Sequence, residues 1–413
     1  MFKKLTSLLA RDAGRGTEPS SVLNADDIRL AYATDGQAGA YKADSTDVRD
    51  AVRQDLRQKA EAAQEQAAFN PVLERSESLS LALGIAQMAD KQVEYTFYEP
   101  KPGFGINTIT PAGGRTGYNP FGRDTDLEVV PTFGRSALVH VPMHQSDYNQ
   151  MDRKSFLSMA RKAAQEQGFG DMSDKDLFNR VNIAQEPGYI NHPATGLQAV
   201  AVVEKESGQL IFGVPGMNGE KVEAVEAAIH LGKNQADVLY QEVLPVVKSA
   251  EHRDRQVVLA GHSLGGSVVQ HVGYHLANPT QSTARLDVQI YNFEGPAIST
   301  ALKDYDPERV SPDRITNIAV EGSQVAKWGT RFGGSHLGGE VHYLKSSFGT
   351  GLKTMMRNHQ MDSVADALAY HVHTGEEPQL VKEANHQAAV DAKRRAQEQE
   401  RTPDMTHGFE LAL

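Results

Sequence analysis

The stretch VVLAGHSLGG at residues 257–266 decides the fold. Its first half is short, apolar and rich in β-branched residues, which predicts a buried strand over Gln256–Ala260. An apolar helix is predicted over Ser263–Leu276, so the G-x-S-x-G pattern falls on the turn between strand and helix. Gly261 and Gly265 remove the side chains that would collide where these two elements approach each other.

A serine on this turn has the surroundings that a catalytic nucleophile needs. The following helix directs its first N–H groups and the positive end of its dipole toward the turn. The backbone N–H of Leu264 can then donate to the oxyanion that forms when Ser263 attacks a carbonyl carbon. The simpler interpretation is an ordinary strand and helix with a capping serine, but the buried strand and apolar helix around the motif favour a nucleophile.

Strands and helices alternate around this motif. Further strands are predicted over Leu197–Val203, Gln209–Val214, Leu286–Phe293, Arg314–Val320 and Val341–Leu344. Helices are predicted over Asp152–Gln167, about 219–250 with a kink at Pro245, and Met361–Val372. This alternation predicts an α/β fold with a mostly parallel sheet covered by helices on both faces.

Composition narrows the classes of partner and site. The chain has 413 residues, a net charge of −11 and no cysteine. Its length is enough for a sizeable core. The acidic balance argues against a nucleic-acid partner, which requires a basic footprint. The lack of cysteine excludes disulfides and thiolate metal sites.

The motif and its context resemble the class 3 lipases, α/β hydrolases that include fungal triacylglycerol lipases, plant phospholipases and bacterial lipase-like effectors. The resemblance covers roughly residues 185–375 and centres on G-H-S-L-G-G after an apolar strand. Residues 335–341 are similar to the family's H-x-G-x-E-V pattern. Residues 291–296, Tyr-Asn-Phe-Glu-Gly-Pro, resemble the family's next strand end, but they match its aromatic-Gly-x-Pro pattern loosely, because the glycine stands one place later. The resemblance implies a serine hydrolase for lipid esters that needs no cofactor and no metal.

The resemblance also implies a second oxyanion donor. Leu210–Met217 is similar to the family's second core strand, which ends in a glycine and then the donating residue. Gly216 and Met217 stand at those positions. Because the family often has Ser or Thr where Met217 stands, the hydroxyl donor is missing here, and the Met217 backbone N–H, with help from Asn218, is the expected donor.

Two histidines are candidates for the catalytic base. In α/β hydrolases the base follows the last core strand and precedes the last helix, and His359 stands there. His336 comes before that strand, in a motif that is usually structural in the family. We predict that His359 takes the proton of Ser263, with His336 as the alternative base.

The catalytic acid departs from the family pattern. The family places an Asp two residues before a Val at this point, and Ser323 stands at that position here. Glu321 is the nearest carboxylate, and it reaches His359 if the turn is shifted, because Glu is longer than Asp. We therefore predict Glu321 as the acid that orients the imidazole. The alternative is a Ser–His dyad with a weaker orienting group.

The remaining histidines are not predicted to be catalytic. His271 and His275 lie four residues apart on the helix after the nucleophile, a spacing that can bind zinc, but no H-E-x-x-H pattern accompanies them. We interpret them as core or solvated side chains. His262, inside the elbow, is expected to pack or to bond beside the site.

Four regions are predicted along the chain. Residues 1–90 form a polar helical region, in which the run up to Phe69 has a thin apolar stripe and is expected to pack weakly. Residues 91–184 form a mixed region of strands, loops and helices that is a candidate lid. Residues 185–375 form the hydrolase core, and residues 376–413 form a polar helical tail.

We consider several functions. The first is a lipase or phospholipase that cleaves carboxylic esters of lipids at a membrane surface, through an acyl-enzyme on Ser263. This enzyme is also considered as a secreted bacterial effector that meets an export machinery or an immunity partner. The alternatives are a catalytically weak or inactive binding protein, motivated by Ser323, and an esterase for small soluble esters.

The first residues do not predict a cleavable signal peptide. Two lysines are followed by an apolar run that ends at Arg11 and Asp12, which is too short for the apolar part of such a peptide. No stretch approaches the ~20 apolar residues of a membrane span. We expect a protein that is cytoplasmic at synthesis and that is secreted, if at all, without a cleavable signal peptide.

Overall fold

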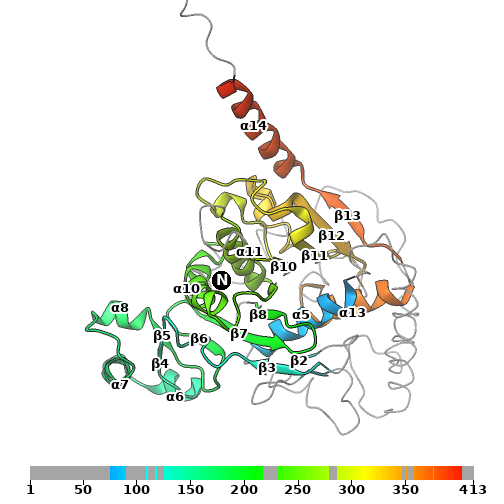
Figure 1. Ribbon diagram of the computed structural model, residues 1–413. Helices are drawn as coiled ribbons and strands as arrows, with labels where there is room; N and C mark the ends of the chain where they lie inside the picture. The colour runs from blue at the N-terminus through cyan, green and yellow to red at the C-terminus, as the bar shows by residue number, and fades with distance from the viewer. Residues whose placement is uncertain are drawn as a thin grey trace, which may run out of the picture.

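A nine-stranded sheet runs through the centre of the computed structural model (Figure 1). The structure describes residues 75–89, 108–109, 117–118, 125–216, 230–278, 286–346, 350, 358–374 and 376–401. The strands stand in the order β13 (Gln379–Lys382), β12 (Glu340–Leu344), β11 (Ile315–Val320), β10 (Val288–Phe293), β9 (Val257–His262), β8 (Leu210–Val214), β7 (Leu197–Glu204) and β3 (Leu127–Val129). β6 (Tyr189–His192) also pairs with β7.

The middle of the sheet is parallel. Neighbouring strands from β8 to β12 are parallel, whereas β13, β7, β3 and β6 pair antiparallel at the two sides. Parallel neighbours require long crossover connections. Helix α10 (Lys233–Lys248) lies in the connection from β8 to β9, and α11 (Leu264–Leu276) joins β9 to β10.

Helices cover both faces of this sheet. Helices α10 and α11 pack on one face, against side chains that include Leu259 of β9. Helices α5 (Ser76–Met88) and α13 (Met361–Thr374) pack on the other, against Val258 and Ala260. Alternate residues of β9 thus enter the two cores, as the two-residue period of a strand requires. This layered, mostly parallel sheet with a serine turn after β9 is the predicted α/β-hydrolase arrangement.

Most predicted core elements are present with ends shifted by one or two residues. The helix predicted over Asp152–Gln167 is α7 (Arg153–Glu166). Asp152 caps it, because its carboxylate accepts the N–H groups of Lys154 and Ser155 at 3.0 Å each. Gly168 follows with φ 77°, a conformation that ends a helix at low steric cost.

The long helix predicted over about 219–250 is not continuous. Leu231 and Gly232 have φ values of 48° and 74°, and α10 begins directly after them. Left-handed residues cannot continue a right-handed helix, so the two positions set its start. Pro245 lies inside α10, and residues 217–229 lie outside the described part of the chain.

The N-terminal region contributes a buried helix. Every residue from Leu79 to Ala89 is buried, and α5 packs on β8 and β9. The carbonyl oxygen of Ile85 comes so close to β8 that a Cβ added to Gly213 would lie 2.5 Å from it. Helix α5 therefore belongs to the core. The run up to Phe69, which is expected to pack weakly, falls within residues 1–74 and lies outside the described residues.

A smaller apolar cluster lies beside the sheet, near β6 (Figure 1). It is built from β4 (Val139–His140), β5 (Val181–Asn182), α6 (Gln145–Gln150), α7 and α8 (Asp174–Phe178). Glu242 of α10 holds the loop that leads into it: this fully buried carboxylate accepts the N–H groups of Gly134, Ser136, Ala137 and Leu138 at 2.6–3.2 Å. Burial raises the pKa of Glu242, although the four N–H groups act in the opposite direction.

The C-terminal segment adds an edge strand before its helix. β13 pairs antiparallel with β12, and Glu340 lies opposite Lys382. Helix α14 (Ala384–Arg401) then extends away from the body (Figure 1). The predicted polar tail is helical over α14, but β13 is absent from the prediction. None of the helices in the described ranges is long and apolar enough to cross a bilayer.

The packing of α5 is tested by Gly213→Ala. The added Cβ would lie 2.5 Å from the Ile85 carbonyl oxygen, so helix and strand must separate. We expect the free energy of unfolding to fall by about 1–3 kcal/mol in urea denaturation. Gly170→Ala is the matched control, since no heavy atom lies within 4 Å of its added Cβ. Equal losses in the two variants would contradict this packing.

Candidate active site

Ser263 stands on a strained turn between β9 and α11. Its backbone has φ 54° and ψ −126°, a conformation that residues with a Cβ rarely adopt. The turn is tight: a Cβ on Gly261 would lie 2.2 Å from the carbonyl oxygen of Gly265, and one on Gly265 would lie 2.3 Å from that of Pro215. The backbone therefore has the geometry of the predicted elbow, and strain of this kind is frequent at functional sites.

The side chain of Ser263 meets His359. Ser263 Oγ donates to His359 Nε2 at 2.7 Å, the length of a normal hydrogen bond. An imidazole that accepts at Nε2 has its proton on Nδ1. The His359 side chain is 12% exposed, and Ser263 is half-buried. The structure thus brings the predicted nucleophile and base together, in contact with solvent.

Glu294 is the carboxylate behind His359. Its Oε2 lies 3.4 Å from His359 Nδ1, and its side chain is fully buried. Glu294 directly follows β10, and in the parallel pairing Phe293 lies opposite His262. The residues after these two, Glu294 and Ser263, therefore lie side by side. The Ser263 N–H also donates to the Phe293 carbonyl oxygen at 2.8 Å.

Neighbouring donors hold the Glu294 carboxylate. The N–H of Val320 donates to Oε1, and the hydroxyl of Ser323 donates to Oε2. The backbone of Glu294 is left-handed, with φ 57°, and its own N–H donates to the Ile318 carbonyl oxygen at 2.7 Å. A buried carboxylate held in this way can orient an imidazole and stabilise its protonated form.

The prediction of Glu321 as the acid is corrected by this geometry. Glu321 contacts the segment before α13 through its backbone, because its carbonyl oxygen accepts Asn358 Nδ2 at 2.9 Å. Its N–H donates to the Leu344 carbonyl oxygen at 2.8 Å, and burial raises the pKa of its carboxyl group. Ser323, where the family has Asp, donates its hydroxyl to Glu294, which supplies the carboxylate from the neighbouring strand.

His336, the alternative base, has other partners. Its Nδ1 lies 2.8 Å from Glu383 Oε1, and its Nε2 lies 2.9 Å from the carbonyl oxygen of Gly295. The side chain is 1% exposed. Both ring nitrogens are therefore engaged, and neither faces Ser263.

His262 supports His359 from one side. The two rings stack with centroids 5.1 Å apart and planes at 29°. His262 Nε2 donates to the His359 carbonyl oxygen at 2.7 Å. Burial, with the nearby His359, lowers the pKa of His262 to about 3. His262 is thus neutral near pH 7 and fixes both the ring face and the backbone of His359.

The oxyanion site is described in part. Leu264 is the first residue of α11, and the first N–H groups of a helix have no acceptor within it. Met217 and Asn218 lie outside the described residues. Gly216 lies against the nucleophile, since a Cβ added to it would be 3.0 Å from Ser263 Cβ. The strand end that leads to Met217 therefore reaches the nucleophile.

The other histidines lie in the packing of α11. His271 is buried and His275 is half-buried, and the His275 ring lies 5.8 Å from the Tyr240 ring. Burial, together with the nearby His275, lowers the pKa of His271 to about 4. Among the described residues, no group of three or more His, Cys, Asp or Glu side chains could hold a metal ion.

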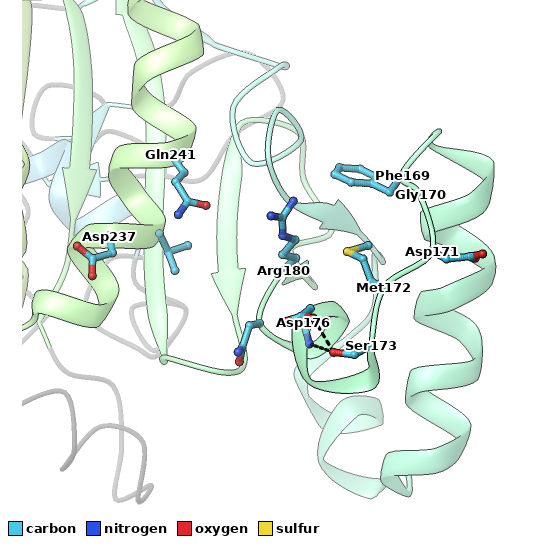
Figure 2. Close-up of a pocket in the computed structure, with 11 residues that line it drawn as sticks. Phe169, Gly170, Asp171, Met172, Ser173, Asp176, Arg180, Asp237 and Gln241 are labelled. Carbon is cyan, nitrogen blue, oxygen red and sulfur yellow. Dashed lines mark hydrogen bonds between the residues drawn. The ribbon is translucent and has the colours of Figure 1, made fainter. Parts of the chain in front are cut away.

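A hollow of about 510 Å³ lies between the segment 169–180 and α10 (Figure 2). Asp176, Arg180, Asp237 and Gln241 line it, and all four are exposed. None of its lining residues belongs to the Ser263 site, so we assign it no catalytic role.

The fold of this chain is similar to parts of several solved lipase structures. No family model matches the sequence, and no curated protein matches it. The Lip2 lipase of Yarrowia lipolytica is 18% identical over 34% of this chain and 60% of its own, with a TM-score of 0.25. The propeptide complex of Rhizomucor miehei lipase is 13% identical over 49% and 70%, with a TM-score of 0.28. Lipase II of Rhizopus niveus is 15% identical over 38% and 64%, with a TM-score of 0.27.

The similarity is therefore partial. The chain spans less than two thirds of the Lip2 and Rhizopus structures. Identities and TM-scores this low do not establish an activity, so the chemistry of the site is derived from its own geometry.

Substituting the two carboxylates separately distinguishes their roles. Glu294→Gln keeps the shape and removes the charge behind His359, so we expect kcat for a chromogenic ester to fall by up to about 10⁴-fold. Glu321→Gln is the matched control and should leave kcat close to that of the unmodified chain. A larger loss in Glu321→Gln than in Glu294→Gln would reverse the assignment.

Proposed function

We propose that this protein is a serine hydrolase that cleaves carboxylic esters of lipids. The observation that supports this most directly is the 2.7 Å hydrogen bond from Ser263 Oγ to His359 Nε2, on a strained turn with a buried Glu294 carboxylate behind the imidazole. A nucleophile, a base and an orienting group in this sequence of contacts can perform acyl transfer.

In the first half of the proposed reaction, Ser263 Oγ attacks the acyl carbonyl carbon while His359 Nε2 takes the hydroxyl proton. The Glu294 carboxylate stabilises the imidazolium that forms. The carbonyl π electrons move to the oxygen, and the N–H groups of Leu264 and Met217 stabilise this oxyanion. When the tetrahedral intermediate collapses, the bond to the alkoxide breaks, and the alkoxide takes the proton from His359.

In the second half, water attacks the acyl-enzyme. His359 Nε2 takes a proton from the water, and the second tetrahedral intermediate collapses to release a carboxylic acid. Ser263 regains its proton from His359, so the site returns to its starting state. No metal or organic cofactor enters either half of this proposal.

The lipid part of the proposal rests on the sequence resemblance to class 3 lipases, with a phospholipid or another acyl glycerol as the substrate class. An esterase for small soluble esters would use the same groups and differ in its preference for substrate. An inactive binding protein is the alternative that Ser323 suggests, and the Glu294 carboxylate, 3.4 Å from His359 Nδ1, argues against it.

The same resemblance supports a finer proposal, a secreted bacterial effector with an export machinery or an immunity protein as partner. Residues 1–74, which precede the buried helix α5, are the segment we assign to export. Removing them should abolish secretion from the producing cell and leave esterase activity intact. Secretion without this segment would contradict the assignment.

The proposed activity is tested by release of fatty acid from mixed phospholipid vesicles. We expect Ser263→Ala and His359→Ala to lose activity by about 10³-fold or more. The exposed Ser146 and His144 provide the controls, and Ser146→Ala and His144→Ala should behave like the unmodified chain. Hydrolysis of soluble short-chain esters alone would favour the esterase. No hydrolysis of either substrate by the unmodified chain would contradict the proposed function.

A further inference from the structure

A buried ion pair ties the C-terminal strand to the turn that holds Glu294. Glu383 directly follows β13, and its two oxygens accept the backbone N–H of His336 at 2.7 Å and the ring Nδ1 of His336 at 2.8 Å. The His336 side chain is 1% exposed, and the Glu383 side chain is 10% exposed. The other ring nitrogen of His336, Nε2, donates to the carbonyl oxygen of Gly295 at 2.9 Å.

The charges of the pair fit these contacts. Burial alone would lower the pKa of His336, but the Glu383 carboxylate and the Gly295 carbonyl raise it above its usual 6.5. Burial alone would raise the pKa of Glu383, but His336 lowers it. Only an imidazolium can donate from both ring nitrogens at once, so the protonated ring links Glu383 to Gly295.

The opposite side of Gly295 is also fixed. Its N–H donates to Asn292 Oδ1 at 3.0 Å, and Asn292 Nδ2 donates to Asn317 Oδ1 at 2.9 Å. A Cβ on Gly295 would lie 2.2 Å from Asn292 Oδ1. Gly295, the residue after Glu294, is therefore held at its carbonyl oxygen by His336 and at its N–H by Asn292.

Glu294 needs such support. Its backbone has φ 57° without being glycine, and a residue keeps this conformation only where its surroundings hold it. The distance of 3.4 Å from its Oε2 to His359 Nδ1 is already long for a charge-assisted hydrogen bond. A small displacement of the turn would therefore remove the contact.

We propose that the His336–Glu383 ion pair positions Glu294 behind His359, so that the residue directly after strand β13 supports the active site. This inference rests on the proposed ester hydrolase. The pair touches neither substrate nor the reacting atoms, and acts through the backbone that carries the acid. A segment expected to be a polar tail thereby supplies a positioning residue.

Displacement of the Glu294 carboxylate is expected to change kcat and not KM. Glu294 stabilises a charge that appears on His359 only during the reaction, so a displaced carboxylate lowers kcat and leaves KM unchanged. A misplacement of about 1 Å can cost about 100-fold in rate. We expect Glu383→Gln, which removes the charge that holds the imidazolium, to lower kcat by about 10- to 100-fold.

A double-mutant cycle on the full chain tests this. In a Glu294→Gln background, Glu383→Gln should cost less than about twofold, because the group that it positions is absent. Lys382→Gln is the matched control: it removes a neighbouring ion pair, 3.3 Å from Glu340, with a largely exposed lysine, and should leave kcat unchanged. Circular dichroism at the assay temperature establishes that each variant is folded.

Two outcomes would overturn the inference. One is an unchanged kcat in folded Glu383→Gln while the unmodified chain hydrolyses esters. The other is an equal loss in both backgrounds, which would assign the pair to stability alone. If Glu383→Gln unfolds, Glu383→Asp keeps the charge, shortens the side chain and enters the same cycle. An unmodified chain without esterase activity would instead contradict the proposed function.

Discussion

The candidate site depends on the parallel register of β9 and β10. Because His262 lies opposite Phe293, the next residue of each strand emerges at the same edge of the sheet, and these residues are Ser263 and Glu294. Their left-handed backbones, with φ 54° and 57°, turn both chains sharply at that edge. His359 lies in the segment before α13, where its Nε2 contacts Ser263 and its Nδ1 faces Glu294.

This register explains how the site keeps a carboxylate without an Asp at position 323. The acid comes from the strand beside the nucleophile, and the Ser323 hydroxyl, where the resemblance leads one to expect an acid, donates to it. The loose match at residues 291–296 is the sequence feature that marks this carboxylate. Glu294 stands where the family pattern has a glycine, and its φ of 57° is a conformation that glycine adopts easily. The carboxylate therefore occupies a position whose backbone is normally left to glycine.

The sequence could predict the parts of the site that depend on local structure. The strand, turn and helix around Ser263 follow from hydrophobic pattern and glycine spacing, and the place of His359 follows from the order of elements. Glu294 could not be chosen over Glu321 from the sequence, because its contact depends on the register between two strands and on donors from a third. The apolar residues of α5 are consistent with burial, but its packing on β8 and β9 is a long-range contact that the local sequence does not specify. The pairing of β13 with β12 escaped prediction because a short, largely exposed edge strand reveals little about its partner.

Helix α5 and the residue that follows β13 both contact the core that carries the candidate site. Helix α5 covers the face of the sheet opposite α10 and α11, and Glu383 reaches the turn after Glu294 through His336. In the proposed site, His359 activates Ser263. Treating the folded chain with a fluorophosphonate and mapping the adduct by peptide mass spectrometry tests it most directly. We expect a single adduct on the peptide that contains Ser263, formed by the native chain and not by the denatured one. An adduct on another serine, or no adduct on the native chain, would contradict it.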